Sequence, residues 1–590
     1  MVMRRVLCAA AALLSAIVLC AHPLATSARR GSAFDKLDLA LARHLATGQD
    51  GAVRVIIQTS GDREHLKSRL KAHGDRIEAD HALIQAFTAT IHGTDLQALA
   101  DDPEVEHVSS DAIVTAHGST SYQPLLVTEG FPDSGKSTGA SVRVAVIDSG
   151  LELTNDLPSS RLLGFFDLTK SDAVVSASAY DDYGHGTHVA GLIAGSGSNS
   201  GGFYSGIAPS AKVLALKVLD KTGSGYTSDV IQAIDFIVAN QKTYAIDIIN
   251  LSLGHPILES AATDPLVQAV QKASQAGIIV VAAAGNYGQN PSTGLPGYAG
   301  IASPGNAPSA ITVGAVDIVD SATRGDDTIP VYSSRGPSWY DGYAKPDVVA
   351  PGQRLVSIAA LNGTLYQQYP ELRIVGKTGD VARYFRLSGT SMATAVATGS
   401  VALMLDAAGS NKKYFTPNLV KAILQWTAIP MAGYDALTQG AGAINGAGAL
   451  ALTRKIDPTA AVGSTWLTSS ISPSTTIANT TYSWGQTVVW GNTVVWGNVV
   501  DTNQAAWAQT VVWGNTVVWG NTVVWGNNTV WSNPTTWSAT VVWGNNLIGT
   551  TDGTTVVWGN TQVTSSTVVW GNLATVTGVN GTNTFSEVQR

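Results

Sequence analysis

The sequence predicts an α/β fold in which a mostly parallel β-sheet is flanked by helices, with a small α+β unit before it and a β-rich tail of hexapeptide repeats after it. Between residues 122 and 453, apolar runs alternate with amphipathic helical patterns, which is typical of βαβ units. The runs are apolar at successive positions, as strands of a parallel sheet are when both of their faces are buried. The tail is predicted by the recurrence of the unit Thr-Val-Val-Trp-Gly-Asn after residue 481.

The first 28 residues have the layout of a secretory signal. Arg4 and Arg5 precede an apolar run over residues 6–21, and a stretch of small residues follows. The run is too short to span a membrane comfortably. Both cysteines of the chain, Cys8 and Cys20, lie inside this segment. We therefore expect a secreted or cell-surface protein whose exported part has neither disulfide bonds nor thiolate chemistry.

Charged residues are scarce. They make up 13% of the 590 residues, against about 25% in an average soluble protein, and the net charge is −8. This composition argues against a long coiled coil and against a charged disordered chain. The sequence also has no cluster of Lys and Arg that would suggest a nucleic-acid partner.

Residues 35–118 predict a small α+β unit of the split βαβ type. The pattern of apolar and polar residues indicates strands at 52–59, 83–91 and 105–114 and helices at 63–72 and 94–100.

The central unit has strands and helices with readable ends. Asp264 with Pro265, and Thr416 with Pro417, have the arrangement of an N-cap followed by the first residue of a helix. One apolar helical face lies within residues 230–238. The strands are expected at 142–147, 246–251, 278–284 and 311–316.

The tail is expected to consist of a linker over 454–480 and a Trp-rich repeat region over 481–575. Twelve of the 15 tryptophans lie in the repeat region, many of them six residues apart, and residues 458–590 carry only four charged side chains. Because six is even, an extended chain would place these side chains on one face. A meander of hairpins and a solenoid of six-residue rungs both fit the pattern. The Trp rows could bind a surface or a polysaccharide, or could form the tail's own core.

Asp148 is the first candidate for chemistry in the central unit. It directly follows a strand predicted to be buried, in the run Val-Ile-Asp-Ser-Gly, so it lies at the carboxyl edge where parallel sheets place their sites. An Asp-Ser-Gly after a strand is, taken alone, more often a turn.

His185 is the second candidate, with His188 as its competitor. His185 stands between Gly184 and Gly186, so its backbone can approach another segment closely. Two histidines three residues apart could also bind zinc, but the intervening glutamate and a third ligand are missing, so we expect no metal site here.

Ser391 is the third candidate. It opens an Ala-rich helical run in Gly-Thr-Ser-Met-Ala-Thr-Ala, where a serine is most often only a cap. A catalytic role for Ser391 is favoured by the other two candidates, because an Asp, a His and a Ser each stand in a glycine-rich frame, in that order along the chain.

With these residues the sequence resembles the subtilisin-type serine proteases, whose catalytic residues occur in this order. The resemblance covers about residues 140–453, and the preceding segment resembles the inhibitory propeptide of the family. It implies a protease in which Ser391 is the nucleophile, His185 the general base and Asp148 the residue that orients the histidine. It also implies that the amide of Asn286 helps to stabilise the oxyanion.

The resemblance further implies polypeptide substrates bound as an added strand. Ser252, Leu253 and Gly254 would line the cleft, and small residues of the wall would favour an apolar or aromatic side chain before the scissile bond. Those wall residues are Ala283, Ala284 and Gly285. No cofactor is required; calcium sites are common in the family, but no full ligand set can be matched in this sequence. Ala395 stands where the family usually has Pro, which puts the positioning of Ser391 in question.

Two functions follow from these observations. The first is a secreted endopeptidase made as a precursor, whose N-terminal unit acts as an intramolecular inhibitor and is cut off by the enzyme itself near residues 116–122. The alternative is a surface-binding or structural protein in which the tail is the functional part and the protease domain is residual. The complete set of Asp148, His185, Ser391 and Asn286 favours the enzyme.

Overall fold

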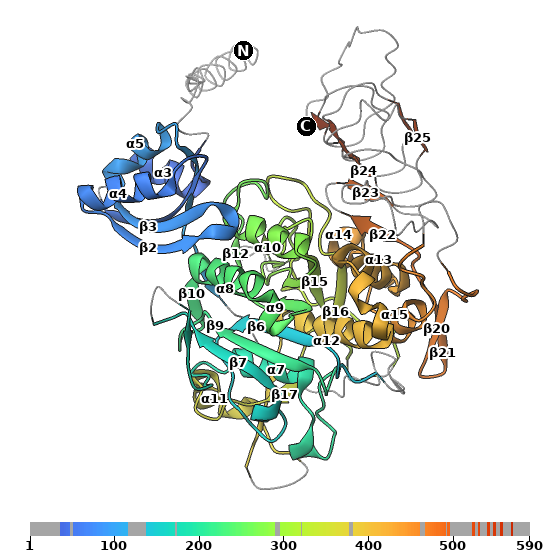
Figure 1. The fold of residues 1–590 in the computed structure, drawn as a ribbon. Coiled ribbons are helices and arrows are strands. Elements are labelled where there is room, and N and C mark those ends of the chain that lie inside the picture. The colour runs from blue at the N-terminus through green and yellow to red at the C-terminus, as the bar shows by residue number, and fades with distance from the viewer. Residues whose placement is uncertain are drawn as a thin grey trace, which may run out of the picture.

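The computed structural model describes residues 36–47, 51–115, 137–170, 174–289, 295–319, 321, 323–376, 381–460 and 467–490, together with seven short strands of the tail. The expected signal at 1–28 and the expected cleavage region at 116–122 lie outside the described residues. A small N-terminal unit sits on a larger α/β unit, and the first part of the C-terminal region follows on the opposite side (Figure 1).

The N-terminal unit is an antiparallel sheet covered by helices, which confirms the α+β prediction. The strands lie in the order β2-β3-β1-β4. The sequence prediction missed β2. The strands are β1 (Ala52–Thr59), β2 (Arg76–His81), β3 (Ala86–His92) and β4 (Val105–Ser110), and the helices are α3 (Leu39–Thr47), α4 (Arg63–His73) and α5 (Leu96–Ala100), with 3-10 turns η1 (Ala82–Ile84) and η2 (Gly93–Asp95).

The single strand predicted over 105–114 is wrong, because the chain breaks at Asp111. The Asp111 carboxylate accepts hydrogen bonds from the backbone N–H and the hydroxyl of Ser228, both at 2.7 Å. Ser228 lies in the first turn of α8 (Thr227–Ala239), where a negative charge is favourable. Beyond this anchor, β5 (Ile113–Thr115) leaves the N-terminal sheet and pairs antiparallel with β10 (Ser224–Tyr226) of the α/β unit.

The α/β unit is built on one eight-stranded sheet, and the prediction that this sheet is mostly parallel is confirmed. Its order is β16-β15-β13-β11-β6-β9-β7-β8, and all neighbours are parallel except β7 and β8. The strands are β6 (Arg143–Asp148), β7 (Leu162–Asp167), β8 (Val175–Ser176), β9 (Lys212–Lys217), β11 (Ile248–Leu251), β13 (Ile279–Ala283), β15 (Ile311–Val316) and β16 (Val348–Pro351).

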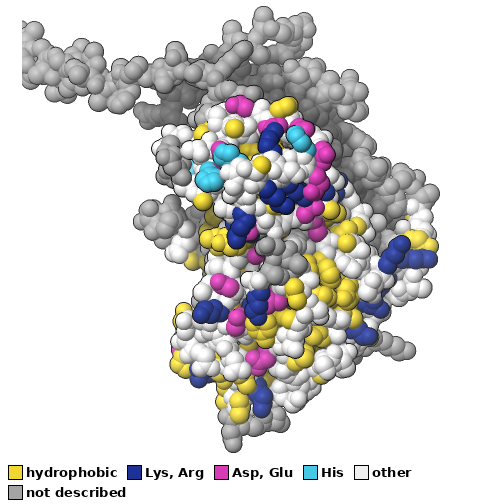
Figure 2. All heavy atoms as spheres, turned by 60° about the vertical axis from the view of Figure 1, so that its left-hand side comes forward, with side chains coloured by type: hydrophobic (Ala, Val, Ile, Leu, Met, Phe, Trp, Pro, Cys, Tyr) yellow, Lys and Arg dark blue, Asp and Glu magenta, His cyan; other side chains and the backbone are white. Residues whose placement is uncertain are grey.

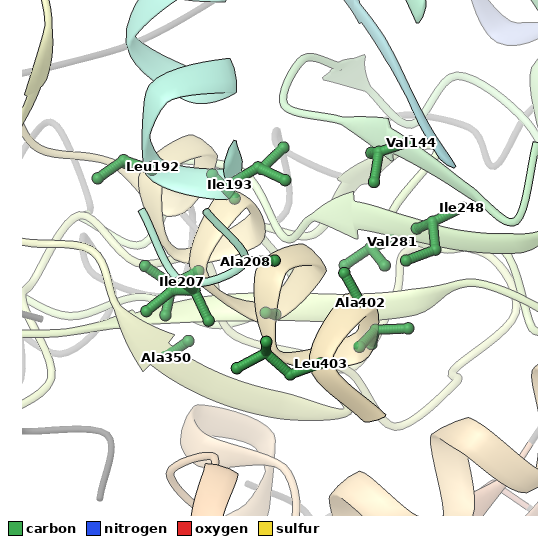
Figure 3. Packing of buried hydrophobic residues seen from close by; sticks show 14 of the residues in the cluster. Val144, Leu192, Ile193, Ile207, Ala208, Ile248, Val281, Ala350, Ala402 and Leu403 are labelled. Carbon is green, nitrogen blue, oxygen red and sulfur yellow. The ribbon is translucent and has the colours of Figure 1, made fainter. Parts of the chain in front are cut away.

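Helices cover both faces of this sheet, because successive strand residues point to opposite sides. Val144 and Val146 of β6 pack in one core with α7 (His185–Ala194) and α12 (Thr390–Ala408). Ala145 and Ile147 pack in the other with α8 and α10 (Pro265–Gln275). Figure 3 shows side chains of α7 and α12 together with strand residues of the first core, among them Val144, Ile248 and Val281.

Two predicted helix starts are confirmed. The Asp264 side chain accepts from the N–H groups of Leu266 and Val267 at the start of α10. The Thr416 hydroxyl accepts from Leu419 at the start of α13 (Pro417–Thr427).

The segment Thr390–Tyr414, which contains α12, is long and apolar enough to span a membrane. However, 78% of its most apolar window is buried inside the protein. We therefore interpret α12 as a core helix of the α/β unit.

The remaining helices, strands and 3-10 turns connect the elements described above or lie at the edges of the α/β unit. They are α9 (Gln241–Tyr244), α11 (Thr364–Gln368), α14 (Ala436–Gln439), α15 (Gly446–Thr453), β12 (His255–Pro256), β14 (Ala302–Ser303), β17 (Leu355–Ile358), β18 (Arg373–Ile374), β19 (Tyr384–Leu387), and the turns η3 (Ser159–Arg161), η4 (Ser198–Ser200), η5 (Pro370–Leu372) and η6 (Gly409–Tyr414).

The start of the C-terminal region packs on the α/β unit. The hairpin of β20 (Ser474–Ile477) and β21 (Thr480–Ser483) leads to Trp484, which is 4% exposed and belongs to the core that contains α12. The indole N–H of Trp484 donates to the Thr475 hydroxyl at 2.8 Å. One tryptophan of the six-residue series therefore packs against the α/β unit.

Further along, the tail is described only at short strands. β22 (Val488–Trp490) and β23 (Thr493–Val495) pair antiparallel. The others pair in parallel, as stacked rungs of a solenoid would; they are β24 (Thr522–Val524), β25 (Thr529–Trp531), β26 (Thr540–Val542), β27 (Leu547–Gly549), β28 (Thr555–Val557) and β29 (Val568–Val569). The rest of the Trp-rich repeat region lies outside the described residues.

Candidate active site

Asp148 and His185 lie together at the carboxyl edge of the central sheet. Asp148 ends β6, between β9 and β11, and His185 begins α7. The Nδ1–H of His185 donates to Oδ1 of Asp148 at 2.8 Å, and both side chains are almost fully buried. The carboxylate thus holds one ring nitrogen and leaves Nε2 for other chemistry.

A second carboxylate, Asp181, fixes the backbone around this pair. Its oxygens accept from the hydroxyl of Ser149 at 2.9 Å, from Gly184 N–H at 2.7 Å and from Thr187 N–H at 2.8 Å. Asp181 therefore links the residue after Asp148 to the first turn of α7. The sequence interpretation missed it, although an acidic residue four positions before the helix start was a usable signal.

The glycine frame allows the close approach that the sequence interpretation inferred. A Cβ on Gly186 would lie 2.3 Å from the carbonyl oxygen of Gly150, where no side chain fits. Any larger residue there would push α7 away from the Asp148 strand.

His188, the competing histidine, has a structural position. Its Nε2–H donates to the carbonyls of Leu355 and Phe385, both at 3.1 Å. Burial lowers the pKa of His188 to about 3, with the neighbouring His185 acting in the same direction. The ring therefore stays neutral and ties α7 to β17 and β19.

Ser391 lies in the first turn of α12, and its hydroxyl faces β11. The hydroxyl donates to the carbonyl of Ser252 at 2.8 Å, and the Ser252 hydroxyl donates to the carbonyl of Ser391 at 2.9 Å. Within the described residues, the buried Nε2 of His185 has no hydrogen-bond partner. Ser391 thus has a hydrogen bond to Ser252 in this conformation, and His185 Nε2 is available.

A buried chain of hydrogen bonds continues behind Ser391. The amide of Asn250 on β11 donates to the Ser252 hydroxyl at 2.9 Å, and the Thr398 hydroxyl donates to Asn250 Oδ1 at 2.8 Å. All three side chains are fully buried. These bonds join the strand to α12 and fix its position. The sequence interpretation missed Asn250, whose signal is a polar residue inside an otherwise apolar strand.

Asn286 follows β13 and faces the start of α12. Its Oδ1 accepts from the backbone N–H of Thr390 at 3.0 Å and from the Thr390 hydroxyl at 3.1 Å. The amide nitrogen is the group of Asn286 that remains to donate. Asn286 and Ser391 line the same cleft.

This cleft contains about 240 Å³ of space, part of it open to solvent. Among the predicted substrate-binding residues, Leu253, Gly254, Ala283 and Gly285 line it, whereas Ser252 and Ala284 are not among its lining residues. Ser252 instead holds Ser391, as described above. Ala284 is fully buried, and its carbonyl accepts from Ala302 N–H at 2.9 Å.

The end of the N-terminal unit lies in the same cleft. Thr115 lines it, and Thr115 N–H donates to the carbonyl of Gly254 at 3.2 Å. Val114 beside it is fully buried against residues of the α8 core. With β10 on one side and Gly254 on the other, β5 is an added strand between two edges of the α/β unit.

Lys217, at the end of β9, binds backbone and side-chain oxygens, some of them close to Asp148 and His185 in the sequence. Its ammonium group donates to the carbonyls of Ser149 and Leu219 at 2.7 and 2.6 Å and to the Asp182 carboxylate at 2.7 Å. The side chain is 1% exposed. The sequence interpretation missed this residue too.

Comparison with known proteins decides the family. The Subtilase family matches residues 139–449, more than half of the chain. The chain belongs to the subtilase family. It is 34% identical to serine protease AprX of Bacillus subtilis (strain 168) over 67% of this chain and 85% of that protein. It is 33% identical to subtilisin E of the same organism over 58% of this chain and 75% of that protein.

A solved structure shows the same fold. Fervidolysin from Fervidobacterium pennivorans, described as a keratinolytic enzyme related to subtilisin, has a TM-score of 0.53 to this chain. The alignment covers 68% of this chain and 61% of fervidolysin, at 20% identity, so it speaks for the fold alone. This subtilase is therefore a subtilisin-like serine endopeptidase, and its substrates are polypeptides. Some subtilases bind calcium, but no calcium site of this chain is shown by these comparisons.

Proposed function

We propose that this subtilase cleaves peptide bonds with Ser391 as nucleophile, His185 as general base, Asp148 as the orienting carboxylate and Asn286 as an oxyanion donor. The observation that carries the proposal is the 2.8 Å bond from His185 Nδ1 to Asp148, which leaves Nε2 without a partner among the described residues, together with the cleft that Ser391 and Asn286 line. An isolated serine hydroxyl is a weak nucleophile near neutral pH, so it needs the base.

The reaction starts when the Ser391 hydroxyl turns from the Ser252 carbonyl to His185 Nε2. His185 takes the proton as the oxygen attacks the substrate carbonyl, and Asp148 stabilises the imidazolium. The developing oxyanion accepts hydrogen bonds from the Asn286 amide and from the Ser391 backbone N–H. His185 then gives the proton to the leaving amine, and water hydrolyses the acyl-enzyme by the same route.

Substrate binds as an extended strand between β10 and Gly254, in the position that β5 takes in this structure. The residue before the scissile bond enters a pocket with uncharged walls, among them Leu253, Ala283 and Ala302. Such walls favour an apolar or aromatic side chain, because a charged one would lose its hydration without gaining a partner.

The N-terminal unit, residues 35–118, acts as an intramolecular inhibitor of the precursor. Its last described residue, Thr115, lines the cleft and is bonded to Gly254, and Val114 before it is buried against the core that contains α8. The chain then continues from a cleft that also holds Ser391, which supports self-cleavage within residues 116–122. The signal-like segment at 1–28 supports export of the precursor.

A Ser391→Ala variant tests both cleavage and self-processing. In a protease-free host we expect it to accumulate as uncut precursor and to resist labelling by a fluorophosphonate, while the wild type is cut and labelled. Ser400→Ala is the matched control, because Ser400 lies on the same helix and only donates to the Val396 carbonyl at 2.9 Å. Normal processing of Ser391→Ala would contradict self-cleavage, and labelling of that variant would contradict its role as nucleophile.

A further inference from the structure

We propose that the N-terminal unit binds one divalent transition-metal ion of the zinc class between His73, Asp75, His92 and Asp95. One ligand atom from each of these residues lies within 4.8 Å of all the others. The site is far along the chain from the catalytic residues, and it does not depend on the function proposed above.

Two short segments bring the four residues together. His73 is the last residue of α4, and Gly74 ends this helix in a left-handed conformation (φ 101°), which turns the chain so that Asp75 leads into β2. His92 ends β3, and Asp95 lies in the turn η2 that follows. The pairing of Arg76 on β2 with Thr90 on β3 holds the two segments side by side.

The distances fit tetrahedral coordination. In a tetrahedron with metal–ligand bonds of about 2.1 Å, two ligand atoms are about 3.4 Å apart. His73 Nδ1 lies 3.7 Å from Asp75 Oδ2 and 3.2 Å from Asp95 Oδ2. His92 Nδ1 lies 2.9 Å from Asp75 Oδ1 and 3.7 Å from Asp95 Oδ2. The four distances bracket the ideal value. Asp75 contributes Oδ2 to one of them and Oδ1 to another, so a rotation of its carboxylate would have to present a single oxygen to the ion.

The burial of the carboxylates points to a missing cation. The Asp75 side chain is 0% exposed, and its Oδ2 has no hydrogen-bond partner in the described part of the chain. Asp95 Oδ2 is also buried and without a hydrogen-bond partner in that part of the chain, although the Asp95 side chain as a whole is 23% exposed. Among the described residues, no Lys or Arg lies within ion-pair distance of either carboxylate. The other oxygen of Asp75, Oδ1, accepts from the backbone N–H of His92 at 3.2 Å and lies 2.9 Å from its Nδ1. A buried carboxylate oxygen without a partner is costly, and one divalent ion would balance both charges.

The donor set selects the class of ion. Two imidazole nitrogens and two carboxylate oxygens suit zinc and its neighbours, whereas calcium takes six to eight oxygen ligands. The two histidine rings are 61% and 56% exposed, so an ion can enter from solvent. Histidine side chains are visible at the surface of the N-terminal unit, close to acidic ones (Figure 2). The bound ion would join the end of α4 to the end of β3 and so stabilise this small unit.

The uncut Ser391→Ala chain, stripped of metal and then titrated with Zn²⁺ against a chromogenic chelator, tests the proposal. We expect one tightly bound equivalent per chain and a higher melting temperature of the N-terminal unit, and we expect neither effect with Ca²⁺. The double variant His73→Ala/His92→Ala should lose both effects. His65→Ala is the matched control and should keep them, because His65 lies on the same helix, is 62% exposed and pairs with Glu104 instead.

Three results would overturn the proposal: no stoichiometric Zn²⁺ binding, equal binding by the double variant, or equal binding of Ca²⁺. If the double variant fails to fold by circular dichroism, Asp95→Asn decides, since this side chain is 23% exposed and keeps its shape. Loss of the Zn²⁺ equivalent in folded Asp95→Asn supports the site, and its retention refutes the four-ligand arrangement.

Discussion

The proposed inhibition by the N-terminal unit should depend on pH in part through Asp235 of α8. Burial raises the pKa of this carboxyl from 3.8 to about 7, and Asp80 of the N-terminal unit adds to the effect, while the Leu83 amide and Arg63 offset part of it. Leu83, Asp80 and Arg63 all belong to the N-terminal unit. When that unit leaves, water reaches Asp235 and its pKa falls towards the ordinary value.

The direction of this pH dependence follows from which state, the complex or the free enzyme, keeps the proton on Asp235. The complex keeps the proton on Asp235 at pH values where the free enzyme has lost it, so raising the pH from about 4 to about 7 weakens the complex. Below and above this window the Asp235 contribution is constant. One unit of pKa shift corresponds to a factor of ten, so the inhibition constant should rise by at most about 100-fold between pH 5 and pH 7 through this group.

The measurement compares Asp235→Asn with the wild type, using mature enzyme and one preparation of the N-terminal unit added in trans. Because the inhibitor is the same for both enzymes, its own pH dependence cancels in the ratio of the two inhibition constants. Asn cannot ionise, so the variant should bind more tightly than the wild type at pH 7 and similarly near pH 4. Asp457→Asn, at a partly exposed residue that follows α15, should behave as the wild type. A ratio that does not change between pH 5 and pH 8 would refute the reasoning.

Three further results are expected. Asn286→Ala should lower kcat by about 100- to 1,000-fold with little change in KM, measured with a peptide substrate, because one oxyanion donor is lost. Val114→Asp should weaken inhibition by the N-terminal unit at least tenfold in the same trans assay, since it places a charge in a fully buried position. Asn250→Ala should lower the free energy of unfolding by about 1–3 kcal/mol, seen in urea denaturation, because the hydrogen-bonding groups of Ser252 and Thr398 lose their partner; unchanged stability would contradict this role.

Much of the fold could be predicted from the sequence because it is encoded locally. A strand buried on both faces is apolar at most positions, so β6, β11, β13 and β15 were recognisable. The caps at Asp264 and Thr416 depend on residues at most three positions away. The break at Asp111 could not be predicted in this way, since its partner Ser228 is 117 positions further along the chain.

The candidate site also divides into residues that the sequence identifies and contacts that only the structure shows. The sequence by itself determined Asp148, His185 and Ser391 as candidates, through their glycine-rich frames and their order along the chain, and the resemblance to the subtilisin-type proteases added Asn286. His185 and His188 have similar neighbours in the sequence. Only the tertiary structure therefore shows that His185 hydrogen-bonds to Asp148 and that His188 hydrogen-bonds to two backbone carbonyls. It alone brought Asn250 to Ser252, Lys217 to the backbone after Asp148, Thr115 at the end of β5 to the cleft, and His73 to Asp95. These contacts join segments that are remote in the chain, and the packing of helices on both faces of the sheet decides which of them meet.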